Sequence, residues 1–206
     1  MTRLRKSDFL LLVRAAKGGF VFRSDARRKN WSVSEPLFKG LMVRHFTFDP
    51  RDGESPYGAT SSERWGSDIQ RSDDRGLTWT ELEPLNRQES RGRWNPGEGG
   101  LILYSIVPDR HDKMKMHVAI SAAGVFYTED GGRSWQPRNR GTRADFLPDK
   151  HPDLGQCVHK LLPAADGERR YQHNHCGAYR SDSSAEQWTD VDRASVRDLD
   201  FAWGHT

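Results

Sequence analysis

One eight-residue motif constrains this chain more than any other feature, because it recurs along almost its whole length. The motif, Ser/Thr-x-Asp-x-Gly-x-Ser/Thr-Trp, is complete at Ser72–Trp79 and Thr128–Trp135 and degraded at Ser24–Trp31 and Ser181–Trp188. We call each copy a box. The tryptophans that end the four boxes follow one another after 48, 56 and 53 residues. A repeat of about 40–50 residues is typical of one four-stranded blade of a β-propeller. The sequence therefore predicts an all-β fold, a β-propeller with about four recognisable four-stranded blades.

The box is predicted to act as a turn device. Its aspartate and hydroxyl side chains accept backbone N–H groups, its glycine supplies a positive φ, and its tryptophan packs between sheets. In the degraded boxes, Ala26 and Ser183 replace the aspartate, and Arg28 and Ala185 replace the glycine. We interpret the box as a structural fastener rather than as a calcium loop or a source of catalytic carboxylates. The residues that define the two complete boxes are Ser72, Asp74, Gly76, Thr78, Trp79, Thr128, Asp130, Gly132, Ser134 and Trp135.

Short strands with alternating polar and apolar residues precede each box, and no segment shows a 3.6-residue apolar period. The chain is therefore read as one repeat domain over residues 1–206. The expected blades cover approximately 1–40, 41–84, 99–138 and 155–192. A long loop is expected over 136–156, and the start of a further blade over 193–206.

Charge and hydropathy argue against several classes of function. The net charge is +3, but positive and negative residues are mixed along the chain, so no basic stripe indicates a nucleic-acid partner. The apolar run Phe9–Val13 is shorter than the roughly 7–15 residues of a secretion signal or the roughly 20 of a membrane span. These features predict a soluble, cytoplasmic protein with no membrane partner. The two cysteines fit a reducing compartment.

The boxes resemble the bacterial neuraminidase repeat, which is shared by sialidases, xyloglucanases and sortilin-type receptors. Longer stretches are similar to the bacterial group labelled sialidase-like or exo-α-sialidase, namely Ile69–Asp74, Ala119–Val125, Pro137–Gly141, Arg143–Pro148 and Gln172–Gly177. The resemblance implies a propeller of six or seven blades, whereas four are recognisable here. We therefore expect an incomplete or shortened propeller, whose open blade edges offer a route to self-association.

The resemblance also implies what a sialidase would need. Such an enzyme uses an arginine triad, a Tyr nucleophile assisted by Glu, an Asp acid/base and usually an Arg-Ile-Pro element. This sequence has no Arg-Ile-Pro, and no Tyr–Glu pair can be assigned. The favoured function is therefore a scaffold that binds a glycan, another small polar ligand or a protein. The alternative is a glycoside hydrolase acting on a carboxylated or β-linked glycan.

The candidate ligand site combines the long loop with the strand that precedes the turn at Gly177. Arginines suit bidentate capture of a carboxylate, the group that distinguishes sialic acids, although a loop with charges of both signs is also what a solvated surface looks like. The residues chosen are Arg138, Arg140, Arg143, Asp145, Gln172, Asn174 and His175.

A second pattern lies on two consecutive strands of the last blade. With a three-residue loop centred on Asp166, the residues Cys157, His159, His173 and His175 share one face and form a zinc-type ligand set. With a two-residue turn the register shifts by one, and Cys157 lies opposite Cys176, where a disulfide becomes possible. A third interpretation is ordinary strand residues. No cofactor is otherwise expected.

Overall fold

The chain folds into β-sheets, as the box spacing predicts. The computed structural model describes residues 8–62, 66–82, 85, 94 and 101–191, so the expected start of a further blade over 193–206 lies outside the described residues. The described part of the chain contains strands and no α-helix, and no helix in it is long and apolar enough to cross a membrane.

Four antiparallel sheets follow one another along the chain, and within each sheet the strands pair only with their neighbours in sequence. The first sheet contains β1 (Phe9–Ala15), β2 (Gly18–Ser24) and β3 (Trp31–Val33). The second contains β4 (Met42–Phe48), β5 (Pro56–Ser62), β6 (Gly66–Arg71) and β7 (Thr80–Glu81). The third contains β8 (Leu103–Pro108), β9 (Met116–Ile120), β10 (Gly124–Thr128) and β11 (Gln136–Pro137). The fourth contains β12 (Val158–Pro163), β13 (Arg170–Asn174), β14 (Gly177–Ser181) and β15 (Thr189–Asp190).

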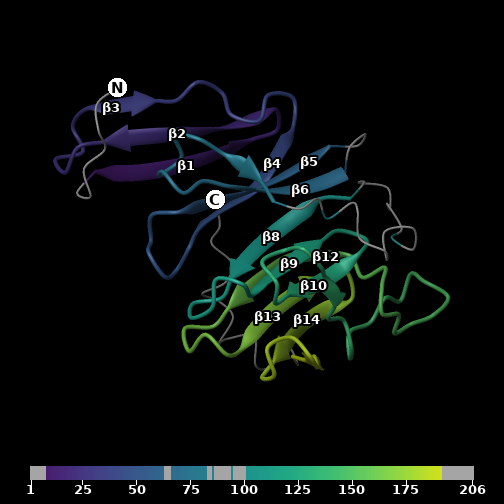
Figure 1. Cartoon of the computed structure of the whole chain (residues 1–206). Coiled ribbons are helices and arrows are strands. Elements are labelled where there is room, and N and C mark those ends of the chain that lie inside the picture. The colour runs from purple at the N-terminus through teal and green to yellow at the C-terminus, as the bar shows by residue number, and fades with distance from the viewer. Residues whose placement is uncertain (1–7, 63–65, 83–84, 86–93, 95–100, 192–206) are drawn as a thin grey trace.

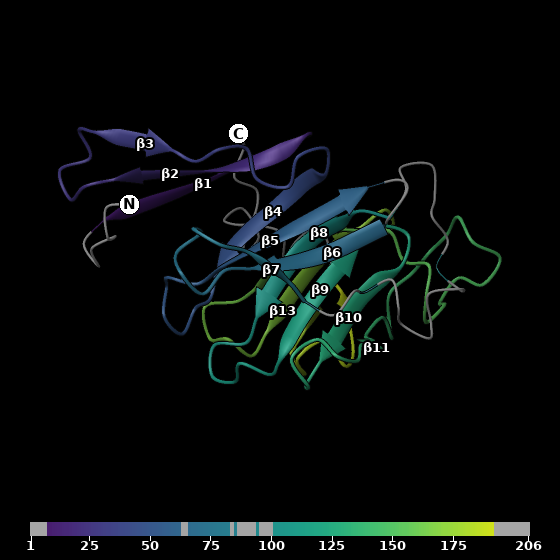
Figure 2. The ribbon, with the colours of Figure 1, turned by 45° about the horizontal axis from the view of Figure 1, so that its top comes forward.

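The sheets are arranged as the blades of a propeller, with the first strand of each sheet innermost. The inner strands β1, β4, β8 and β12 adjoin one another in that order, and the box strands β3, β7, β11 and β15 lie outermost. Figures 1 and 2 show the second, third and fourth sheets stacked face to face, with the first sheet beside β4. The all-β propeller predicted from the sequence is confirmed, with the difference that the described first sheet has three strands.

Apolar side chains fill the spaces between the sheets. One cluster joins the second sheet, through Tyr57 and Ile69, to Val118 and Phe126 of the third. Another joins the third and fourth sheets, and it includes Trp188 of the last box. The first sheet meets the second at β4 and through fully buried Val21, which lies against Gly76 of the box that follows β6. The hydrophobic effect at these faces is the main force between blades.

The outward face of the first sheet is different, because it is apolar and exposed. The strand register places Phe9 and Leu11 of β1 on the same face as Trp31 and Val33 of β3. All four side chains are exposed, and about half of the surface of Trp31 is accessible. The corresponding Trp135 and Trp188 are buried, since each of them packs within the cluster that joins its sheet to the preceding one.

Both complete boxes form the same hydrogen-bonded turn. In the second, the Asp130 carboxylate accepts the backbone N–H and the hydroxyl of Ser134 at 2.9 and 2.6 Å. The Thr128 hydroxyl accepts the N–H of Gly132 at 2.9 Å, and Gly132 has a φ of 95°. The indole of Trp135 donates to the Gly132 carbonyl at 3.0 Å. The second box thus satisfies its own polar groups while it delivers Trp135 to the space between sheets, whereas the buried indole N–H of Trp79 in the first box has no hydrogen-bond partner among the described residues.

The last degraded box keeps this turn, although a serine hydroxyl replaces the carboxylate as hydrogen-bond acceptor. Ser183 takes the place of the aspartate, and its hydroxyl accepts the backbone N–H of Gln187 at 3.1 Å. Ala185 takes the place of the glycine at a φ of 70°, in the left-handed region that costs a residue with a Cβ about 1 kcal/mol. Its N–H still binds the hydroxyl of Ser181 at 3.0 Å. Packing of the sheet therefore imposes the turn even where the motif is lost.

We predict that Asp130→Ala lowers the free energy of unfolding by about 1–2 kcal/mol, as loss of a capping carboxylate does. Burial opposes ionisation of Asp130, but hydrogen bonds led by that of Ser134 hold its pKa at about 2, against an ordinary 3.8. This contribution is therefore complete above about pH 4 and is lost as the pH falls towards 2. Urea unfolding at pH 7 and pH 3 measures both effects. Asp182→Ala, which removes only an exposed pair with Arg180, is the control and should change little.

We predict that the double substitution Ser183→Asp with Gln187→Thr stabilises the chain by about 1 kcal/mol, because it restores the carboxylate acceptor and its hydroxyl donor. The melting temperature should rise by about 2–4 °C for a chain of this size. Differential scanning calorimetry measures the change, and an unchanged or lower melting temperature would contradict it.

Candidate functional site

A β-bulge occurs at the same position in three of the four inner strands. The register of β4 shifts between Val43 and His45, that of β8 between Leu103 and Ser105, and that of β12 between Val158 and Lys160. A bulge adds one unpaired residue and redirects its side chain. The extra residues are Arg44, Tyr104 and His159, which we call the bulge row.

The bulge row forms a continuous line of side chains across three blades. The Arg44 guanidinium lies 5.9 Å from the centroid of the Tyr104 ring, within the range of a cation–π contact. The Tyr104 ring lies 5.8 Å from that of His159. The line continues to His173 on β13 and His175 in the turn after it, whose rings are 5.7 Å and 4.5 Å from that of His159. Three consecutive blades therefore contribute to one half-buried surface.

Cationic groups surround the inner strands close to the bulge row. Burial, together with the charges of Lys160 and Arg14, lowers the pKa of His45 to about 4, although a hydrogen bond involving Ile106 opposes the shift. Burial and the charge of Arg14 also lower the pKa of Lys160. His45 is therefore neutral near pH 7, and the positive charge comes from Arg14, Arg44 and Lys160. Side chains of β1, β4 and β12 thus create a positive potential along the inner strands.

A sulfur and imidazole cluster lies beside the bulge row. The Cys157 sulfur is 3.4 Å from Nε2 of His159 and 3.4 Å from the hydroxyl of Ser121. One ligand atom from each of Cys157, His159 and His175 lies within 4.8 Å of the others. Burial, then the charge of His175 and that of His173, lowers the pKa of His159. Three of the four predicted metal ligands are therefore brought together, with His173 next to them.

The pairing of β12 with β13 contains both registers that the sequence analysis considers, one on each side of the bulge. Next to the turn, Leu161 pairs with Gln172, which is the register that would place Cys157 opposite Cys176. The bulge at His159 then shifts the pairing by one, so that Val158 pairs with Asn174. Cys157 and Cys176 are both free thiols, and the Cys176 sulfur accepts the backbone N–H of Asp145 instead.

The predicted loop residues Arg143 and Asp145 do lie next to the end of β13, but their backbone groups make the contacts, to Asn174 and Cys176. Asn174 donates its amide to the Arg143 carbonyl at 3.1 Å, and the Arg143 N–H donates to the Tyr179 hydroxyl at 3.3 Å. The exposed side chains of Arg143 and Asp145 bind each other at 2.7 Å. That ion pair lowers the pKa of Asp145, which keeps its carboxyl ionised at neutral pH. The loop is thus anchored to the end of the last sheet.

The other predicted ligand residues lie elsewhere. The carbonyls of Arg138 and Arg140 accept the side-chain and backbone N–H groups of Trp188, next to the last box. The Arg138 guanidinium lies over the ring of Tyr127 at 5.1 Å. Gln172 is buried on the opposite face of β13 from His173, between its register partners Leu161 and Tyr179. The structure thus separates Arg138, Arg140 and Gln172 from His175.

Sequence reasoning missed the bulge row, although a weak signal exists. Each of the three inner strands places one apolar residue before two large or polar ones, namely Val43-Arg44-His45, Leu103-Tyr104-Ser105 and Val158-His159-Lys160. Such a break in the alternation of a strand is compatible with a bulge, yet it does not reveal that the three bulges adjoin.

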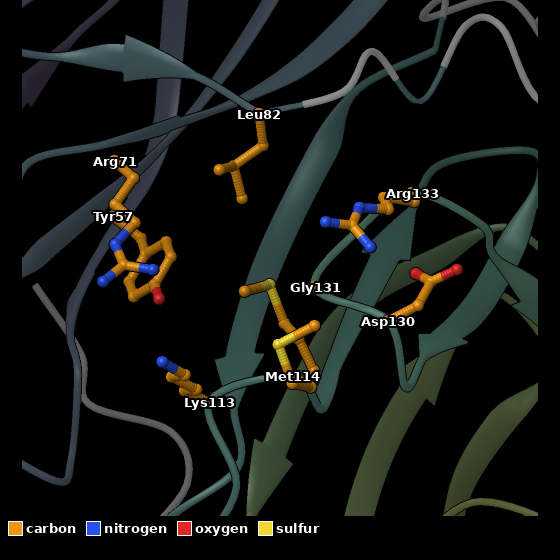
Figure 3. A pocket seen from close by; sticks show the side chains of 9 residues that line it. Tyr57, Arg71, Leu82, Lys113, Met114, Asp130, Gly131 and Arg133 are labelled. Carbon is orange, nitrogen blue, oxygen red and sulfur yellow. The ribbon is translucent and has the colours of Figure 1, made fainter.

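A pocket between the second and third sheets was also missed, because its residues come from distant segments. Its volume is about 290 Å³, and Figure 3 shows its basic side chains Arg71, Lys113 and Arg133 around Met114. Arg71 is paired with Asp73 at 2.7 Å, and the carboxylate of Asp130 serves the box turn. The pocket therefore lies at the box end of the sheets, opposite to the bulge row.

The chain matches no protein-family model and no curated protein. It is similar in structure to an ancestral GH74 enzyme, with a TM-score of 0.56, 14% identity, and 88% of this chain and 24% of that chain covered. It is similar to PorZ, a bacterial surface component of the type-IX secretion system of Porphyromonas gingivalis, with a TM-score of 0.55 and 13% identity over 89% of this chain and 26% of PorZ. It is also similar to a putative 6-phosphogluconolactonase from Bacteroides uniformis, with a TM-score of 0.52 and 13% identity over 89% of this chain and 54% of that chain.

These structures share the fold of the chain, and the chain spans about a quarter to a half of their length. The structural neighbours are β-propeller proteins at low sequence identity. They therefore identify this chain as β-propeller in fold, and the finer resemblance to the sialidase-like group stays a prediction.

Proposed function

We propose that this chain is a propeller-type binding module that holds a carboxylated glycan at the bulge row. The observation that supports the proposal is the coincidence of three bulges, which brings Arg44, Tyr104 and His159 from separate blades to one surface. A strand end that carries bulged polar and aromatic residues is typical of a binding site rather than of a core.

The chemistry of this surface suits an acidic sugar. The Arg44 guanidinium presents several N–H donors that match a carboxylate, and Arg14 and Lys160 raise the local concentration of anions. The Tyr104 ring offers a flat apolar face together with a hydroxyl that donates and accepts hydrogen bonds. The exposed Arg143 suits the ligand less well, because its guanidinium already binds Asp145. Similarity to a GH74 enzyme is in keeping with a glycan-related role, although it concerns the fold alone.

We predict that Arg44→Ala weakens binding of sialyllactose about tenfold, which corresponds to the loss of about 1.4 kcal/mol from one charged contact. Lys160→Ala should act in the same direction, and added salt should reduce the difference. Calorimetric titration with sialyllactose and with its neutral parent lactose measures the effect. Arg180→Ala, which removes an exposed arginine paired with Asp182, is the matched control. Equal affinity for the two sugars, or unchanged binding by Arg44→Ala, would refute the proposal.

The second candidate function is glycoside hydrolysis, and one carboxyl favours it. Burial, and then the charge of Glu81, raises the pKa of Asp68 on β6 to about 6. A raised pKa suits the general acid of a glycosidase. Asp68 pairs with Thr60, which pairs with Val43, so it lies two strands outward from the start of the bulge in β4.

For this alternative we predict that Asp68→Asn abolishes any turnover of fluorogenic glycosides. The rate of the unmodified chain should fall as the pH rises through about 6, because the acid form of Asp68 is lost. A pH–rate profile of both proteins measures this. Absence of turnover across a panel that includes a sialoside would leave the binding module as the function.

A further inference from the structure

The residues Cys157, His159 and His175 have the spacing of a metal centre. In a tetrahedral zinc site, bond lengths of about 2.3 Å to sulfur and about 2.0 Å to nitrogen place these atoms roughly 3.5 Å apart. The Cys157 sulfur and Nε2 of His159 are 3.4 Å apart, and the third ligand atom lies within 4.8 Å of both. His175 is exposed, whereas Cys157 and His159 are half-buried.

The bulge at His159 produces this convergence. Without it, the register beside the turn would continue and would place Cys157 opposite Cys176. The shift between Val158 and Lys160 instead pairs Val158 with Asn174, and the adjoining residues Cys157 and His175 have ligand atoms within 4.8 Å of each other. The same bulge redirects His159 itself. One irregularity in β12 therefore replaces a pairing of two thiols with a thiol and two imidazoles.

We propose that Cys157, His159 and His175 bind one transition-metal ion of the zinc class and leave its fourth position open to water. Cys157 would release its proton to solvent on binding and ligate as the thiolate. Thiolate and imidazole ligands select Zn²⁺, Co²⁺ or copper over Mg²⁺ and Ca²⁺, which prefer oxygen. Three protein ligands with one open position are the arrangement in which zinc binds an exogenous group.

The surroundings of the three ligands support this assignment. The Ser121 hydroxyl lies 3.4 Å from the Cys157 sulfur, where it can donate to a bound thiolate and orient it. The ring of Tyr104 lies 5.8 Å from that of His159, and the ring of Phe146 lies 5.8 Å from that of His175. The inference goes beyond the proposed glycan binding and does not depend on it.

The experiment titrates tag-free, chelator-stripped protein with Co²⁺ and then displaces the cobalt with Zn²⁺. The expected result is one ion per chain, with the intense visible bands of a tetrahedral site and a thiolate-to-cobalt charge-transfer band in the near ultraviolet. Cys157→Ser should remove the charge-transfer band and weaken zinc binding at least about 100-fold, beyond the 10–100-fold typical of outer-shell partners. His175→Ala should weaken binding similarly.

Two variants and one measurement keep the test decisive. Cys176→Ser removes the other thiol, whose sulfur accepts the Asp145 N–H, and should leave the cobalt spectrum unchanged. His173→Ala should weaken binding less than tenfold, because His173 is outside the three ligands. Thermal unfolding without metal establishes that each variant is folded. The proposal is overturned by unmodified protein that gives no stoichiometric cobalt spectrum, by a Cys157→Ser variant that keeps it, or by equal losses in Cys176→Ser or His173→Ala.

Discussion

Face-to-face packing is the constraint on which the whole structure depends, because in the described chain no hydrogen-bonded strand pair joins one sheet to another. Within each sheet the strands pair only with their neighbours in sequence, so each blade forms by local hairpins. It is held to the next blade mainly by packed side chains, with a few backbone hydrogen bonds such as that from the Trp188 N–H to the Arg140 carbonyl. Such an arrangement is close to one-dimensional, and each sheet is stable only when a neighbour covers its apolar face. The exposed Leu11 and Trp31 follow from this rule, since no described sheet covers the outward face of the first blade.

The two ends of the sheets have separate tasks. The boxes and the turns between the first two strands of the sheets meet at one end, where the N–H of Gly131 in a box donates to the carbonyl of Met114, between β8 and β9, at 2.9 Å. The bulge row, the turns between the second and third strands of the sheets, and the anchored loop around Arg143 meet at the other end. A box aspartate such as Asp130 is therefore remote from the proposed ligand surface. Its carboxylate is also committed to the hydrogen bonds of its own turn.

How much of this was predictable depends on whether a feature is repeated or single. The blades could be predicted from the box because the motif and its tryptophan occur four times, once in each blade. The site could not, because it depends on one extra residue in each inner strand, and a shift of one residue changes which side chains meet. Strand spacing predicts that Cys157, His159 and His175 share one face with His173. Only their place in a loop assigns Arg138 and Arg140 to the candidate ligand site that contains His175. Their carbonyls in fact hold Trp188.

The bulges connect the two proposals physically. A regular inner strand would direct alternate residues into the spaces between sheets, where Val43 and Leu103 lie buried. An inserted residue has no partner across the ladder, so its side chain is free to turn along the propeller face. Because the inner strands adjoin, equivalent insertions meet one another, and Arg44, Tyr104 and His159 do so without any long-range strand pairing. A repeated local irregularity can therefore build a site from separate blades, while the variable residue at each insertion sets its chemistry.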